Sequence, residues 1–110
     1  MTQVRPFSKY TIEAVKLLGK QIQFGRKQRR WSEAELAERA KIARSTLQRI
    51  EKGDMACKVG PVFEVATLVE IKLFDADREL LKGRIHEVDE RIALLPKQIH
   101  PRRKPVDDEF

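Results

Sequence analysis

The 110-residue chain contains one cysteine, seven aromatic residues and no long apolar stretch. The lone cysteine, Cys57, excludes an intramolecular disulfide and suits a reducing compartment. No apolar run approaches the about 20 residues that a membrane helix needs. The segment Met1 to Phe7 is also too short and too polar for a signal-peptide core. We therefore expect a cytoplasmic protein.

Residues that carry catalytic or metal chemistry are equally scarce. Only three serines occur, and no base is placed beside any of them. The two histidines, His86 and His100, lie far apart and have few candidate ligands near them. No glycine-rich phosphate loop follows a strand, and no convincing strand is predicted. We expect no enzyme, no metal site and no cofactor.

Charge is present in abundance, but it is unevenly distributed. Residues 1–53 hold 13 Lys and Arg against 5 Asp and Glu, a net charge of +8. Residues 54–110 hold 10 against 12, a net charge of −2. A basic half suits a phosphate backbone, and the more acidic half indicates a different kind of partner.

The stretch Trp31–Gly53 carries the strongest local signals. Ser32 and Glu35 have the spacing of a capping box, which predicts a helix that begins at Glu33. The inward positions of this helix are Leu36, Ala37 and Ala40. A second helix is expected from about Arg44 to Lys52, since Leu47 and Ile50 form an apolar stripe and Gly53 is placed to end it. Only Lys41, Ile42 and Ala43 remain for the turn.

Two helices joined by a turn of three or four residues form a helix-turn-helix, whose second helix fits the major groove of DNA. The chain resembles the DNA-binding unit of the Xre/Cro family, related to phage repressors, over about residues 12–74. "STLQRIEKG" is similar to the usual end of its recognition helix, and the family's fixed small and apolar positions fall on Ala37, Ile42, Leu47 and Ile50. The resemblance implies that the base readers are Arg44, Ser45, Gln48 and Arg49. The expected phosphate contacts are Lys41, Thr46, Lys52, Arg29 and Arg30.

Two positions depart from the family pattern. Lys41 stands where the family usually has Gly, so a side chain must tolerate a left-handed turn at a cost of roughly 1 kcal/mol. Glu33 stands where the family usually has a Gln that anchors a phosphate, and a carboxylate there cannot donate and is repelled. One alternative is therefore an interaction module that has lost DNA binding.

Helices are also expected on both sides of this stretch. The first runs from Ser8 or Thr11 to Gln28 and packs across the pair, and its basic end is either a phosphate contact or a solvated charge run. The next is opened by Gly60 and Pro61 and is apolar almost all round, as in a buried core helix or a subunit interface.

The last helix is expected from Ala76 to Leu95 with Asp75 as its cap. Its heptad seam either folds back on the domain or pairs with its twin, and palindromic DNA favours the twin. The seam consists of Leu81, Ile85, Val88, Ile92 and Leu95. Pro96 ends the helix, and the tail after it is expected to be disordered. The end of the tail is either a solubilising segment or a docking peptide made of Asp107, Asp108, Glu109 and Phe110.

We thus predict an all-α, compact five-helix, repressor-like helix-turn-helix domain with an extended C-terminal helix and a disordered tail. The expected divisions are an N-terminal arm (1–10), the helix-turn-helix domain (11–74), the C-terminal helix (75–95) and the tail (96–110). The expected function is sequence-specific repression by a homodimer on a palindromic operator in double-stranded DNA. The whole chain also resembles the HipB-like antitoxins of HipA-type kinase toxins, which implies that it binds such a toxin. The alternative is a stand-alone regulator of the Xre or phage type.

Overall fold

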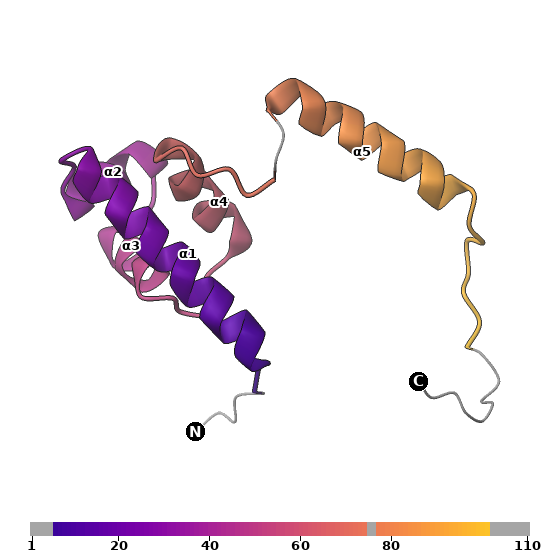
Figure 1. Ribbon diagram of the computed structural model, residues 1–110, viewed down its shortest axis with the longest axis horizontal. Helices are drawn as coiled ribbons and strands as arrows, with labels where there is room; N and C mark the ends of the chain where they lie inside the picture. Colours follow the sequence, from indigo (N-terminus) through magenta and orange to yellow (C-terminus); the bar gives the residue numbers. More distant parts are fainter. Residues whose placement is uncertain (1–5, 75–76, 102–110) are drawn as a thin grey trace. The chain divides into compact units, whose positions relative to one another are not determined.

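The computed structural model of the protein describes residues 6–74 and 77–101, and these residues contain five helices and no strand. The all-α prediction is confirmed. The described residues divide into two compact units, with the boundary after Phe74. The first unit holds α1 (Lys9–Gln28), α2 (Glu33–Ala40), α3 (Arg44–Glu51) and α4 (Val59–Leu68), and the second holds α5 (Arg78–Ala93) (Figure 1). No helix among the described residues is long and apolar enough to cross a membrane.

Helix α1 is capped by Ser8, whose hydroxyl accepts a hydrogen bond from the Thr11 N–H at 3.2 Å. It packs against α3 as predicted, and the contact is very close at Gly19. A Cβ at Gly19 would stand 2.6 Å from the Ile50 carbonyl oxygen, nearer than real Cβ atoms approach. Burial is confined to the later part of α1, where Ile22 is fully buried, while Ile12 near its start is exposed.

The bounds of α2 and α3 agree with the predicted helix-turn-helix. The capping box forms at Ser32 and Glu35, with hydrogen bonds of 3.0 and 2.8 Å, and α2 begins at Glu33. Lys41 ends α2 in the left-handed conformation, with φ +57° and ψ +45°. Gly53, after α3, has φ +79°. Both unusual backbone positions were expected from the sequence.

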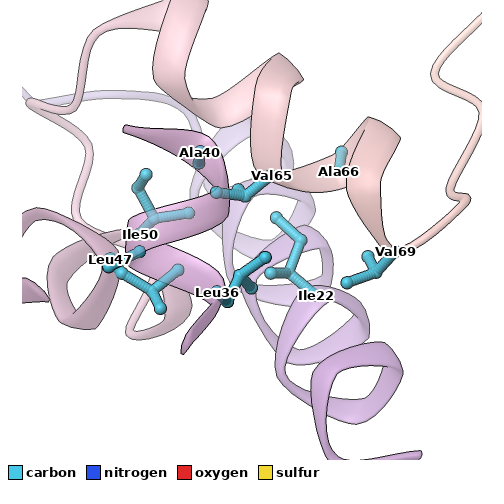
Figure 2. Close-up of a cluster of buried hydrophobic side chains, with 9 residues drawn as sticks. Ile22, Leu36, Ala40, Leu47, Ile50, Val65, Ala66 and Val69 are labelled. Atoms are coloured by element: carbon cyan, nitrogen blue, oxygen red, sulfur yellow. The ribbon is translucent and has the colours of Figure 1, made fainter. Parts of the chain in front are cut away.

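The core of the first unit takes one fully buried large side chain from each of its four helices (Figure 2). These side chains are Ile22, Leu36, Leu47 and Val65. The other buried residues of this core are Ala37, Ala40, Ile50, Ala66 and Val69. Helix α4 packs on α2, with Pro61 in its first turn. This helix was expected to be apolar almost all round, as in a buried core helix or a subunit interface. Val65 and Ala66 are buried in the core, whereas Val59 and Phe63 are 68% and 37% exposed.

The second unit corrects the expected start of the last helix. Asp77 is the N-cap of α5, and its Oδ1 accepts from the Leu80 N–H at 3.0 Å. The helix begins at Arg78, so the predicted cap Asp75 is wrong; Asp75 and Ala76 themselves lie outside the described residues.

The end of α5 differs from the prediction as well. The helix ends at Ala93, and Leu95 therefore lies beyond its last turn rather than on the seam. Pro96 follows directly and disfavours helical backbone at the residue before it. Residues 96–101 contain no helix. The predicted docking residues Asp107, Asp108, Glu109 and Phe110 lie outside the described part of the chain.

Candidate nucleic-acid interface

One face of α3 is fixed by packing and the other is left to solvent. Leu47 and Ile50 are buried in the core, as the apolar stripe predicts. Because a helix turns every 3.6 residues, the opposite face presents the predicted base readers. Arg44, Ser45 and Arg49 are exposed and Gln48 is half-buried. α3 thus presents two guanidinium groups, a hydroxyl and an amide on one outward surface.

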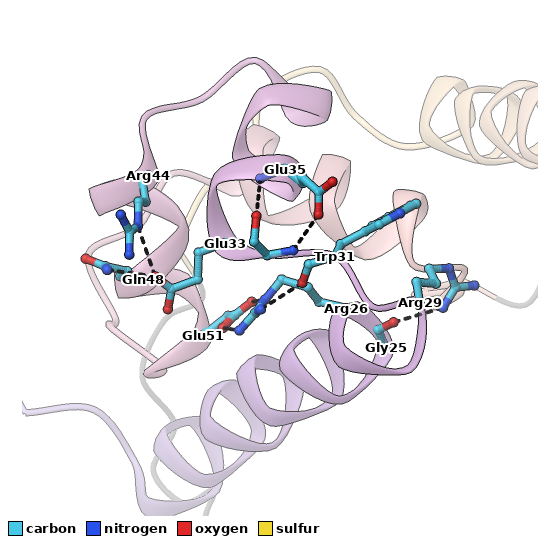
Figure 3. Close-up of polar contacts among 10 residues, drawn as sticks. Gly25, Arg26, Arg29, Trp31, Glu33, Glu35, Arg44, Gln48 and Glu51 are labelled. Atoms are coloured by element: carbon cyan, nitrogen blue, oxygen red, sulfur yellow. Dashed lines mark hydrogen bonds and ion pairs between the residues drawn. The ribbon is translucent and has the colours of Figure 1, made fainter.

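A buried ion pair between Arg26 and Glu51 joins the end of α1 to the end of α3 (Figure 3). Arg26 donates from Nε to Glu51 Oε2 at 2.7 Å and from Nη2 to Oε1 at 3.0 Å. Its Nη1 also donates to the Trp31 carbonyl at 3.0 Å. The two side chains are 7% and 5% exposed, and the hydrogen bond to Glu51 raises the pKa of Arg26. This one guanidinium joins the end of α1, the entry to α2 and the end of α3.

The Arg26 pair also corrects a prediction. The basic end of α1 was expected either to contact phosphate or to be solvated, yet Arg26 does neither. Arg29 donates to the Gly25 carbonyl at 3.1 Å and lies 3.3 Å from Glu70. Its guanidinium also lies over the Trp31 ring, 5.9 Å from the centroid. Arg30 is exposed and adopts φ +59°.

Glu33 lies between the predicted base readers rather than apart from them (Figure 3). Its Oε1 accepts from Gln48 Nε2 at 2.9 Å and from Arg44 Nε at 3.1 Å. The hydrogen bond from Gln48, followed by that from Arg44, lowers the pKa of Glu33. We call Glu33, Arg44 and Gln48 the α2–α3 clamp. Since Arg44 and Glu33 are partly exposed, the clamp contributes orientation more than stability.

Arg49 is held at the other end of α3. Its Nε donates to Asp54 Oδ2 at 2.8 Å, and Asp54 Oδ1 accepts from the Ala56 N–H at 2.8 Å. The Ala56 N–H, followed by Arg49, lowers the pKa of Asp54. Asp54 therefore joins the last turn of α3 to the loop that follows it.

A hollow of about 480 Å³, lined by three lysines, two glutamates and two glutamines, lies beside the clamp. Its walls bring together α1 and both helices of the helix-turn-helix, with Lys16, Lys20, Gln23, Glu33, Gln48, Glu51 and Lys52 as the lining residues. Lys52 was predicted to bind phosphate, whereas Lys16 and Lys20 were missed. The two lysines are four positions apart on α1, and this helical spacing is the only feature of the sequence that indicates that they share one face. Lys41 is exposed at the turn, and Thr46 is half-buried on α3.

Metal-binding geometry is not found in the described part of the chain, where no three His, Cys, Asp or Glu side chains gather. Cys57 is partly buried against the core, and burial raises the pKa of its thiol.

Residues 22–67 match the family model described as Helix-turn-helix. The match runs from the middle of α1 through α2, the turn and α3 to near the end of α4. Comparisons with curated proteins and with solved structures gave no match. Residues 22–67, less than half of the chain, therefore resemble the helix-turn-helix family, and α2 and α3 have the arrangement that gives the family its name.

Proposed function

We propose that the protein is a sequence-specific repressor that binds a palindromic operator as a homodimer. The observation that carries the proposal is the outward face of α3, where four polar side chains lie opposite the buried Leu47 and Ile50. Occupying a promoter is enough for repression, so the mechanism requires no cofactor.

Base reading in this proposal rests on Arg44, Ser45, Gln48 and Arg49. An Arg guanidinium grips guanine O6 and N7, and a Gln amide grips adenine N6 and N7, with about 1–3 kcal/mol of discrimination for each good pair. The clamp supports this role because Glu33 holds both Arg44 and Gln48 before DNA arrives. Side chains that are already oriented lose less conformational freedom on binding.

Phosphate binding is proposed for the cations around this face. Lys52, Lys16 and Lys20 line the same hollow beside α3. The remaining candidates are Lys41, Thr46, Arg29 and Arg30. Such contacts fix the orientation of a protein on the duplex and make its affinity depend on salt, without reading sequence.

Fluorescence anisotropy on DNA from directly upstream of the gene, compared with a scrambled duplex across a salt series, tests this function. We expect selective binding that weakens steeply as salt is added. Arg44→Ala should reduce affinity for the upstream DNA more than for the scrambled duplex. Lys72→Ala, which removes one exposed cation outside the matched domain, is the matched control. Equal, weak binding to both duplexes would contradict the repressor and favour an interaction module.

An antitoxin role is the narrower proposal, and it rests on the resemblance to HipB-like proteins together with the net negative charge of residues 54–110. In this proposal the protein binds a HipA-like kinase toxin and represses its own operon, with the acidic end of the tail, Asp107 to Phe110, as the docking peptide. Deleting residues 104–110 should spare DNA binding and weaken the kinase complex in calorimetry. An unchanged kinase affinity would contradict the docking role, and a stand-alone regulator would bind no kinase.

A further inference from the structure

Helix α5 carries an apolar stripe along one side. All sixteen of its residues are described and none is buried. The four large apolar side chains of the stripe are between 37% and 62% exposed. They are Leu81, Ile85, Val88 and Ile92. The opposite side is polar except for Leu80, which is 58% exposed. His86 lies 3.3 Å from Glu90 on that side, one turn away.

The stripe has the spacing of a coiled-coil core. Steps of four, three and four residues place Ile85 and Ile92 at heptad position a, and Leu81 and Val88 at position d. A β-branched residue at a with Leu at d favours two parallel strands. Three of the four positions fit this rule, and Val88 at d is the exception. Gly83 falls at position f, the position farthest from a partner helix.

The charges beside the stripe distinguish one pairing direction from the other. In a parallel pair, a residue at g faces the residue five positions later, at e, on the second helix. Arg84 at g then faces Asp89 of the second copy. This pair has opposite charges, and two-fold symmetry makes it occur twice.

An antiparallel pair meets less favourable charges. Reversing one helix sets g against g and e against e, so that Arg84 faces Arg91 of the second copy. The attraction between Lys82 and Asp89 on the other side is offset by this repulsion. The charge pattern therefore favours the parallel arrangement.

We propose that α5 pairs with α5 of a second copy of this chain as a parallel, in-register, two-stranded coiled coil. The occupant of the stripe is a second copy because the charges at e and g complement those of an identical helix. The two-fold axis of such a pair runs along the coil, and it is the symmetry that a palindromic operator requires. This inference rests on the homodimer of the proposed function and adds its direction and register.

Disulfide trapping in the full chain tests the direction. In a Cys57→Ser background, Leu81→Cys should form a disulfide-linked dimer under mild oxidation, because position 81 faces itself in a parallel pair. Gly83→Cys, at the outward position f, is the matched control and should link far more slowly. A mixture of ¹⁵N-labelled Leu81→Cys with unlabelled Ile92→Cys, resolved by mass spectrometry, should give homodimers. Mixed 81–92 dimers would show antiparallel helices and overturn the proposal.

Charge reversal provides an independent measurement. Sedimentation equilibrium should show that Arg84→Asp weakens the dimer about tenfold, since two attractive pairs become repulsive. Adding Asp89→Arg should restore it. A tighter dimer with Arg84→Asp alone would indicate the antiparallel pair and would overturn the direction while sparing the homodimer. A chain that stays monomeric at several hundred micromolar would overturn both the direction of the helix pair and the homodimer. Selective DNA binding is tested by the separate anisotropy experiment.

Discussion

Replacing Glu51 by Gln should strongly lower the stability of the helix-turn-helix unit, because the substitution leaves the Arg26 cation buried without its counter-charge. Both side chains are less than one-tenth exposed and meet through two hydrogen bonds. Breaking a pair of this kind by removing one partner costs about 3–5 kcal/mol. In a domain of this size, each kcal/mol lowers Tm by about 4–8 °C. We therefore expect Tm to fall by at least about 12 °C.

Urea denaturation followed by circular dichroism measures the loss directly. The matched control is Glu70→Gln, which removes the same charge from an exposed pair with Arg29. Exposed pairs contribute at most about 1 kcal/mol, so the control should change the free energy of unfolding little. The double variant Arg26→Met, Glu51→Leu should recover most of the loss, since apolar residues of similar volume replace buried ion pairs well. The Trp31 carbonyl would still lack its donor in the double variant.

A loss for Glu51→Gln no larger than that for Glu70→Gln would refute this reasoning. It would mean that water reaches the Arg26 guanidinium and screens its charge. The fold would then depend on the apolar core alone, and the bidentate geometry would have no energetic importance.

Glu33→Gln should raise affinity for both upstream and scrambled DNA about tenfold at 0.1 M salt, because one charge that opposes the phosphates is removed. It should also lower the ratio of the two affinities, because the clamp is weakened, and an unchanged ratio in anisotropy titrations would contradict the clamp. Lys41→Gly should raise the free energy of unfolding by about 1 kcal/mol in urea titrations, because glycine adopts the left-handed conformation without strain, and a loss of stability would contradict this. Asp54 has a pKa below its ordinary value of 3.8, so its stabilising effect is present above about pH 4 and is lost as the pH falls through the folded pKa. Thermal melts should accordingly show Asp54→Asn below wild type in Tm at pH 7, with the gap closing below pH 4; a gap that is constant with pH would count against it.

The parts of the fold that sequence predicts well are those set by neighbours along the chain. The capping box needs only Ser32 and Glu35, three residues apart, and it places the start of α2 correctly. The left-handed turn at Lys41 was expected because the family that the chain resembles usually has Gly at this position, and Lys41 has φ +57°. The start of α5 was harder because two aspartates, 75 and 77, both offer a cap, and the heptad pattern does not distinguish them.

The contacts that sequence missed join residues far apart. Arg26 and Glu51 are 25 positions apart, and Arg26 sits in a run of cations that reads as a solvated helix end. The role of Glu33 was interpreted only as repulsion of phosphate, because its partners on α3 lie 11 and 15 positions later. In each case the pairing depends on how the helices cross, which helical spacing does not specify.

Gly19 gives the crossing of α1 and α3 a further consequence. Backbone lies almost on backbone there, with the carbonyls of Ile50 and Glu51 where a side chain would otherwise stand. The distance between the last turn of α3 and α1 is therefore set by the buried contact at Gly19, on the side of α3 that faces away from solvent. A single methyl group at position 19 would lift that turn while leaving every polar side chain unchanged. Such a protein would keep the same polar side chains on α3 but would present them at a different distance from the major groove of DNA.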